Sequence, residues 1–475
     1  MKFAKLKFVP LGLAACVVGG CAATGSLQAT ATPGFVPPEW ALVEAESLDT
    51  DISQYWTMLN DPLIDQYVEQ AIARNRDLDA AAARVAQARS GVRAARAGYL
   101  PQLNANGSVR RDLGDFSSDE LQFSLGADAS WETDLFGRVS YDVAANRAQL
   151  EAAGFALADL QRLIVGQVVQ TTVSARAIAV QLEIARNTLE IQDENLQIAR
   201  WRLQAGLVSS LDVEQARTQR AQTAATIPAL ERDLAASANT ISTLIGEPPG
   251  AVLAALGDTG AIPVPPGEVG YPVPAQVLRN RPDVRQAEAN LLADGARLGL
   301  ARTQLYPLVR LTGDIRTSSS GIDNLFDVIT GGLLASIGQL IFDGGRTRAQ
   351  IDGAEAQADA SLAGWEQSIL RALEEVETAS VAMRSARERV ALFAEAAEAA
   401  ENAAIIARSQ YLAGLIDFQV LLTSENQLLS ARNALAASEA ERANAFVQLT
   451  QALGGGWTLD DADILTDASD EGNRE

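Results

Sequence analysis

Few residue types in this chain of 475 residues are suited to covalent or metal chemistry. Histidine is absent, and lysine occurs only at Lys2, Lys5 and Lys7. The two cysteines are Cys16 and Cys21. These absences exclude His-based nucleophilic centres, His-ligated zinc and, beyond the first few residues, a P-loop or Schiff-base lysine. Chemistry would depend on Asp and Glu alone, so we expect no enzyme, no cofactor and no metal site; an enzyme with a carboxylate pair is the competing hypothesis.

The charge balance bears on the possible partners. Asp and Glu together number 60 and Lys and Arg 38, which gives a net charge of −22. Nucleic-acid binding depends mainly on Lys and Arg contacts to phosphate, so this balance argues against a nucleic-acid partner.

The amino terminus has the features of an export signal. Residues 1–7 are basic, and residues 8–20 form an apolar run that is too short to span a bilayer. Small residues precede both Cys21 and Cys16, as in the bacterial lipobox, whose cysteine is acylated. We expect a signal peptide over 1–20 and a lipid on Cys21, with Cys16 as the less favoured position. An ordinary signal peptide with incidental cysteines is the alternative.

The remainder of the chain repeats itself once. Five motifs recur in the same order, and the offset drifts only from 205 to 208 residues. We therefore divide the chain into a tether (21–60), two similar halves (61–260 and 261–457) and an acidic tail (458–475). Examples of the recurring motifs are Arg74-Asn75-Arg76 with Arg279-Asn280-Arg281, Tyr99-Leu100-Pro101 with Leu305-Tyr306-Pro307, and Gly206-Leu207-Val208 with Gly414-Leu415-Ile416.

Each half contains two segments in which apolar and polar residues alternate. A period of two is typical of a strand with one apolar and one polar face. The apolar residues lie mostly at odd positions and the polar residues at even positions; Leu334 is an apolar residue on the polar face. The predicted strands are 102–111, 120–136, 307–318 and 329–342.

Long helices follow the strands. The segments 138–205 and 346–413 contain no proline, and a helix of that length extends over about 100 Å. Glycine ends each one, and return helices are predicted over 211–246 and 418–453. A further uninterrupted helix is predicted over 62–98. Uninterrupted apolar runs of about 18 residues are absent, so we expect no transmembrane helix.

Four strands of this length match tilted bilayer-spanning strands, but one open sheet of four would leave its edges unpaired in lipid. Three chains supply twelve strands, an even number that closes a barrel. The polar face would then line a water-filled lumen, and the apolar face would contact lipid. A soluble sandwich explains the alternation but not the long helices, and a soluble coiled coil explains the helices but not the strands. The lumen candidates are Arg110, Asp128, Arg310, Asp314 and Arg316.

Several segments resemble the TolC-type outer-membrane efflux channels, and specifically the NodT-like lipoprotein branch. The resemblance covers nearly the whole mature chain and implies a mixed α and β membrane protein. In such a protein a homotrimer forms a twelve-stranded β-barrel that continues as a periplasmic α-helical barrel. The matching segments are Trp56-Thr57-Met58-Leu59-Asn60-Asp61-Pro62-Leu63, Ser130-Trp131-Glu132-Thr133-Asp134-Leu135-Phe136-Gly137-Arg138, Arg281-Pro282-Asp283-Val284, Ile341-Phe342-Asp343-Gly344-Gly345-Arg346 and Ala452-Leu453-Gly454-Gly455-Gly456-Trp457.

The resemblance also implies a function and partners. The protein would be the outer-membrane exit duct of a tripartite efflux system in a Gram-negative bacterium. It would passively conduct drugs, metals or other small molecules expelled by an inner-membrane pump of the resistance-nodulation-division class. A periplasmic adaptor (membrane fusion) protein would dock to it. The outer-membrane channel of a type I protein-secretion system is the alternative.

In this family the tips of the helical hairpins form the periplasmic entrance and contact the adaptor. Three copies of Asp417 would place three carboxylates around that entrance, although Asp417 is equally suited to cap the helix that begins at Phe418. Trp131 and Phe136 are suited to an interfacial aromatic belt. Phe116 and Phe326 fall in the expected outer loops, where they would restrict the mouth or pack within the loop. The tip residues are Gly206, Leu207, Val208, Ser209, Gly414, Leu415, Ile416 and Asp417.

Overall fold

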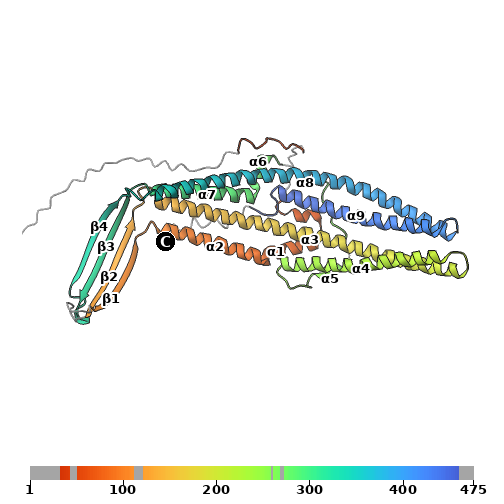
Figure 1. Ribbon diagram of the computed structural model, residues 1–475, viewed down its shortest axis with the longest axis horizontal. Helices are drawn as coiled ribbons and strands as arrows, with labels where there is room; N and C mark the ends of the chain where they lie inside the picture. The colour runs from red at the N-terminus through yellow and green to blue at the C-terminus, as the bar shows by residue number, and fades with distance from the viewer. Residues whose placement is uncertain (1–32, 43–50, 112–120, 258–259, 268–271, 459–475) are drawn as a thin grey trace, which may run out of the picture. The chain divides into compact units, whose positions relative to one another are not determined.

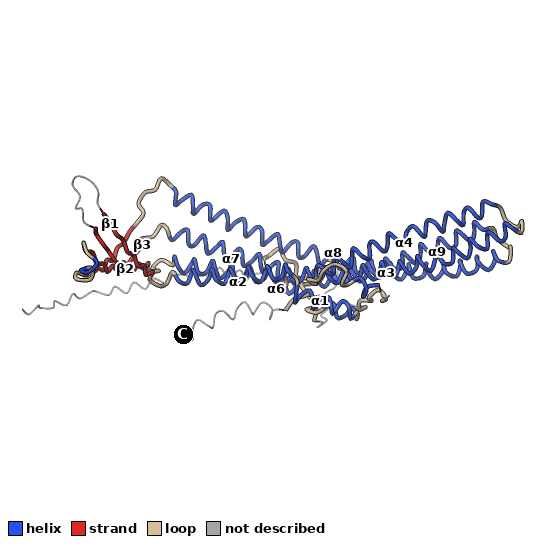
Figure 2. Tube along the Cα trace, turned by 90° about the horizontal axis from the view of Figure 1, so that it is seen from below, coloured by secondary structure: helices blue, strands red, loops and turns tan. Residues whose placement is uncertain are grey.

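The computed structural model describes residues 33–42, 51–111, 121–257, 260–267 and 272–458. These residues are mainly helical, and they include one antiparallel sheet of four strands (Figure 1). Figure 2 distinguishes the strands from the helices that continue from them. The predictions for Cys16, Cys21, Phe116 and the tail from residue 459 onward lie outside the described residues.

The four strands pair in chain order, and each is antiparallel to the next. The first has the predicted range, whereas the second and fourth each end four residues before the predicted end. A short 3-10 helix, η2 (Ile322–Asn324), lies between the third and fourth strands. The strands are β1 (Gln102–Arg111), β2 (Leu121–Glu132), β3 (Leu308–Ser319) and β4 (Ile329–Gly338).

The two early strand ends have different physical causes. The first backbone N–H groups of a helix lack partners within the helix, and a preceding carboxylate can accept from them. Asp134 accepts from the N–H groups of Val139 and Ser140, at 2.8 and 3.0 Å. Asp343 accepts from the N–H of Thr347 at 2.8 Å. The chain must leave the sheet before Asp134 to make these contacts, so β2 stops short. Asp343 lies beyond the predicted end of β4, and β4 stops where its partner β3 begins, because Leu308 is opposite Gly338.

Two long helical hairpins follow the strand pairs. The first consists of α3 (Arg138–Gln204) and α4 (Ser210–Leu244), and the second of α8 (Arg346–Leu412) and α9 (Phe418–Ala452). Both α3 and α8 have 67 residues, which corresponds to about 100 Å of helix. The members of each hairpin pack along one another. The glycine breaks therefore fall where the sequence predicted them.

The predicted uninterrupted helix over 62–98 is wrong. The structure divides it into α1 (Pro62–Arg74) and α2 (Arg76–Ala97) at Asn75. The Asn75 side chain accepts from Asp77 N and Leu78 N at 2.9 and 3.2 Å, so it caps α2. Its amide also donates to Leu244 O at 2.9 Å, which fixes the break against α4. Asparagine favours such a cap over a helix interior.

The second half has a break at the corresponding place. There α6 (Pro274–Asn280) is followed by α7 (Pro282–Thr303), with Arg281 between them. Proline at the first helical position suits this start because its missing N–H would have no partner in the helix.

The main hydrophobic core forms where the middle of α3 meets α1, α9, α5 (Leu253–Gly257) and the 3-10 helix η1 (Tyr55–Leu59). Val165 and Phe446 are fully buried there. This packing explains why α3 includes a segment apolar enough to cross a membrane. The sequence did not predict that segment, because it is not an uninterrupted apolar run. Sixty-one per cent of that segment is buried against other parts of the chain, as expected for a core helix.

A charged cluster holds the start of α7 against its neighbours. Arg281 is 1% exposed and pairs with Asp283 at 2.6 Å and Glu375 at 2.7 Å. Its guanidinium also donates to Ala452 O at 2.9 Å. Burial disfavours the charged form of Asp283, but the hydrogen bond and charge of Arg281 outweigh this effect and hold the pKa of Asp283 below its usual range.

We predict that Arg281→Met lowers the free energy of unfolding by about 3 kcal/mol, because a buried charge network loses its central cation. The stabilisation from Asp283 is present above the ordinary carboxyl pKa and is lost as pH falls through the lowered value. The deficit should therefore shrink below about pH 4. Thermal denaturation in detergent between pH 3 and 8 measures both effects. Arg279→Met, at an exposed neighbouring position, is the control. A similar loss in both variants would contradict the prediction.

Candidate functional site: the polar sheet face and the helix tips

The strand register assembles one polar face of the sheet. Residues paired across antiparallel strands lie on the same face, and the pairs join even positions to even positions in all three ladders. Asp128 is opposite Asp314, and Arg310 is opposite Glu132. The five predicted lumen residues therefore share one face. They are Arg110, Asp128, Arg310, Asp314 and Arg316.

Hydrogen bonds and ion pairs connect the polar face across strands. Asn104 and Asn106 donate to the carboxylate of Asp128 at 3.1 and 3.0 Å. Arg316 is 3.4 Å from the carboxylate of Asp314 along the same strand. Asn104, Asn106 and Arg316 are exposed and the two aspartates are half-buried, so each contact contributes little to stability. The face is a charged surface suited to contact with water.

The opposite face of the sheet is apolar and exposed within one chain. Leu334 is an apolar residue that lies on the polar face instead, as the sequence predicted, because it pairs with Thr312 there. An exposed apolar strand face of this size requires a nonaqueous neighbour. The exposed apolar side chains include Leu103, Val109, Leu125, Trp131, Leu311, Ile315, Leu333 and Ile337.

Aromatic residues gather where the strands meet the helices. The indole N–H of Trp131 donates to Tyr99 O at 3.0 Å. The ring of Phe136 stacks on that of Tyr306 with centroids 5.1 Å apart. Amphipathic rings of this kind are enriched at membrane–water interfaces. Phe326, in the loop before β4, is 65% exposed and therefore does not pack within the loop as one of the two hypotheses supposed.

The two helix tips have the same backbone geometry. Gly206 and Gly414 have φ values of 70° and 74°, in the left-handed region that favours glycine. Leu207 N donates to Arg202 O at 2.8 Å, and Leu415 N donates to Gln410 O at 2.9 Å. Each glycine N–H also donates to a carbonyl three residues earlier, at 3.0 Å, and the two bonds together form a Schellman motif at each tip. The turns present Leu207 and Leu415 to solvent, each 74% exposed.

Asp417 and Ser209 occupy the N-cap positions of the return helices. Both have extended backbone angles, as a cap requires, but neither side chain accepts from an N–H of its helix. The Ser209 hydroxyl lies 3.3 Å from Asp212 instead. The structure thus places Asp417 at the cap position while leaving its exposed carboxylate outside the capping hydrogen bond.

Contacts between the hairpins were not predicted from the sequence. Near the tips Arg202 of α3 donates to Leu412 O at 2.9 Å, and its guanidinium carbon lies 4.3 Å from the ring centroid of Tyr411. Glu194 pairs with Arg408 at 2.5 Å. These residues are separated by about two hundred positions in the sequence, so only their place near the paired glycine breaks could have suggested the contacts.

A half-buried carboxyl group lies in the same region. Both oxygens of Glu425 on α9 accept from the amide of Asn195 on α3, at 2.7 Å each. Burial raises the pKa of Glu425, and the Asn195 hydrogen bond and the charge of Arg408 oppose this shift only in part. A raised pKa means that the packed state favours the protonated form, so the cost of burying the Glu425 carboxylate between the hairpins falls as pH falls.

Among the described residues, no group of three or more Cys, Asp or Glu side chains is placed to hold a metal ion. The arrangement offers a polar sheet face, an apolar sheet face and two matched helix tips.

Comparisons with known proteins identify the family. The family profile of outer membrane efflux proteins matches residues 67–247 and 273–455. Nodulation protein T of Rhizobium leguminosarum bv. trifolii is 30% identical over 470 residues, which cover 95% of this chain and 96% of that protein. The solvent efflux pump outer membrane protein SrpC of Pseudomonas putida is 30% identical, covering 96% and 99%. The cation efflux system protein CusC of Escherichia coli O6:H1 is 29% identical, covering 95% and 99%.

Solved structures agree with this assignment. The outer-membrane channel OprN superposes with a TM-score of 0.80 at 31% identity, covering 89% of this chain and 99% of that one. The CusC crystal structure gives 0.75 at 28% identity, covering 89% and 97%. The chain belongs to the outer membrane efflux protein family. It is a channel component of efflux transport in the outer membrane, and the predicted resemblance to the NodT branch is confirmed.

Proposed function

We propose that three copies of this chain form a continuous duct through the outer membrane and into the periplasm. The supporting observation is the sheet itself. Its order is β1-β2-β3-β4, so β1 and β4 each pair with one neighbour among the described strands. Because β4 runs antiparallel to β1, β4 of one copy can pair with β1 of the next, and three copies close a twelve-stranded barrel.

Within this barrel the polar face lines the passage and the apolar face contacts lipid. The charges of Arg110, Asp128, Arg310, Asp314 and Arg316 then lie in water, where they need no buried partner. The reverse orientation would put them in hydrocarbon, at roughly 2–4 kcal/mol for each Arg near the midplane. The helices α2, α3, α7 and α8, which join the strand ends, continue the duct as an α-helical barrel.

The proposed partners act at the helix tips. A periplasmic adaptor contacts Leu207, Val208, Leu415 and Ile416, and an inner-membrane pump of the resistance-nodulation-division class supplies the energy. The exposed Leu207 and Leu415 support this assignment because each is an apolar contact at the end of a hairpin. Relatives named as cation and solvent efflux proteins favour small-molecule export over the alternative, type I protein secretion.

We also propose that the halves 61–260 and 261–457 are a duplicated unit. Three observations support the duplication. The helices α3 and α8 have equal length, the tips at Gly206 and Gly414 match, and the family profile covers two segments of the chain. The proposal keeps residues 1–20 as the signal peptide and 458–475 as the acidic tail. The lipidated tether, predicted over 21–60, is shortened, because η1 at its end packs into the main core.

The duct predicts a trimer that conducts ions. Purified protein in detergent should have the mass of three chains by light scattering corrected for bound detergent. It should produce ohmic current steps in a planar bilayer. Deletion of β4 removes one edge strand of the sheet and should abolish both the trimer and the current. A monomeric wild-type protein that produces no current would rule out the duct.

Asp417 is proposed to form a ring of three carboxylates at the periplasmic entrance. Asp417→Asn keeps a good N-cap and removes the charge, whereas Asp417→Ala removes both. The ring predicts that both variants weaken inhibition of the current by added divalent cations to the same extent. A capping role predicts instead that only Asp417→Ala has an effect, through a loss of about 1 kcal/mol of helix stability. Single-channel recording and thermal denaturation separate the two outcomes.

Lipid attachment at Cys21 is proposed from the sequence motif. Cys21→Ala should abolish incorporation of labelled palmitate, while Cys16→Ala should leave it intact. Labelling that persists in Cys21→Ala and disappears in Cys16→Ala would assign the anchor to Cys16. Labelling of neither wild type nor variants would indicate an ordinary signal peptide.

A further inference from the structure

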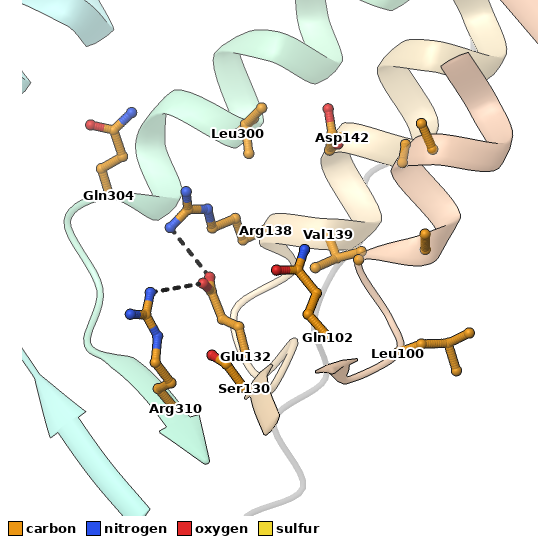
Figure 3. Close-up of a pocket in the computed structure, with 14 residues that line it drawn as sticks. Leu100, Gln102, Ser130, Glu132, Arg138, Val139, Asp142, Leu300, Gln304 and Arg310 are labelled. Atoms are coloured by element: carbon orange, nitrogen blue, oxygen red, sulfur yellow. Dashed lines mark ion pairs between the residues drawn. The ribbon is translucent and has the colours of Figure 1, made fainter. Parts of the chain in front are cut away.

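A pocket lies where the sheet meets the helices (Figure 3). Its volume is about 530 Å³, within the range of roughly 300–1,000 Å³ that is typical of small-molecule sites. The ends of α2, α3 and α7 and the adjoining ends of β1, β2 and β3 contribute its walls. Six elements therefore fix its shape, and none of the proposed tip contacts involves it.

One end of the pocket carries two arginines around a single carboxylate. Arg138 is 3.2 Å and Arg310 3.8 Å from the oxygens of Glu132, and the two approach it from different elements (Figure 3). Two guanidinium groups have ten N–H donors, far more than one carboxylate can accept. This end has a local charge of +1 and has donors left for a second anionic group.

The helices contribute both apolar and polar side chains to the rest of the pocket. Ala94, Ala97, Val139 and Leu300 are apolar lining residues, and Gln304 lies among them. The acidic residue Asp142 also lines the pocket, one helical turn beyond Arg138, and it accepts from Asn146 at 3.2 Å. The two arginines therefore meet at Glu132 beside the strands, and the helical side combines apolar side chains with one carboxylate.

The orientation of the sheet determines where the pocket opens. Glu132 and Arg310 face each other in the strand register, on the same polar face as Asp128 and Asp314. In the proposed trimer this face lines the passage, so three equivalent pockets would open to the lumen at the step from the helical barrel to the β-barrel.

We propose that this pocket is a transit site for small amphiphilic anions, namely molecules that carry a carboxylate on an apolar body. The inference rests on the proposed duct and specifies a substrate class for it. Arg138 and Arg310 bind the carboxylate, and the alanine-lined wall receives the apolar part. The two arginines are 55% and 49% exposed, so the attraction is screened and binding is weak. Weak binding suits a duct, because a tight site would retain its cargo.

The test uses 4-phenylbutyrate as the anionic probe and 4-phenylbutylammonium as its cationic match. Saturation-transfer NMR on the purified protein in a neutral detergent measures binding without requiring conduction. We expect 4-phenylbutyrate to bind in competition with salt and 4-phenylbutylammonium to bind more weakly. The variants Arg138→Gln and Arg310→Gln should each raise the dissociation constant for 4-phenylbutyrate about fivefold. Arg302→Gln, on the last turn of α7 but outside the pocket lining, is the control and should retain binding.

Equal binding of the two probes, or binding of 4-phenylbutyrate that Arg138→Gln and Arg310→Gln leave unchanged, would overturn the transit site. Retained trimer mass and melting temperature in each variant show that a loss of binding is not a loss of fold. Current recordings on the same preparations separate the two proposals. Conduction without selective anion binding overturns the transit site alone. Selective anion binding without conduction overturns the duct, and with it the transit role, and leaves only an anion-binding pocket.

Discussion

The pairing of backbone groups at the edges of the sheet is the constraint on which the proposed assembly depends. Along β1 and β4, alternate N–H and C=O groups point away from the only strand that each pairs with in the described sheet. In water these groups would bond to solvent, but in hydrocarbon each would cost several kcal/mol. The apolar face of the same strands is exposed and cannot be covered by the helices, which begin beyond the strand ends. A ring of copies satisfies both requirements together, because it pairs the edges and turns the apolar face outward.

Local patterns in the sequence were sufficient to predict most elements and both tips. Alternation determined which residues share a sheet face, since the pleat allows only two choices for each residue. Glycine at 206 and 414 predicted the reversals, because the left-handed angles there strongly favour glycine. The errors arose where a short-range competitor acted. Asp134 ends a strand that alternation alone would extend, and Asn75 interrupts a run of good helix formers by bonding to two N–H groups of the next helix.

The contacts that hold distant helices together could not be predicted from such local patterns. The buried Arg176–Asp61 pair spans 115 positions, and the bond from Arg281 to Ala452 O spans 171. Nothing in the local sequence distinguishes these arginines from the many exposed ones in a chain whose later cations are all arginine. Resemblance to a family supplied the architecture but not these partners. The pocket between the sheet and the helices was also not predicted. In the sequence, Glu132 is only the polar end of a strand and Arg138 the first residue of a helix, and the strand register is needed to place Arg310 beside them.

The distribution of packing along the hairpins gives the tips a different mechanical character from the middle. The largest buried cluster lies around the middle of α3 and includes residues from α1, α4, α8 and α9, whereas the cluster near the tips is small and centred on Tyr411 and Phe418. Tip contacts rely more on exposed charged pairs such as Glu194–Arg408. Pairs of this kind exchange readily with water, while a buried apolar cluster opens only at the cost of its whole contact area. Local opening therefore requires least free energy at the tips, so the proposed entrance coincides with the part of each hairpin that separates most easily.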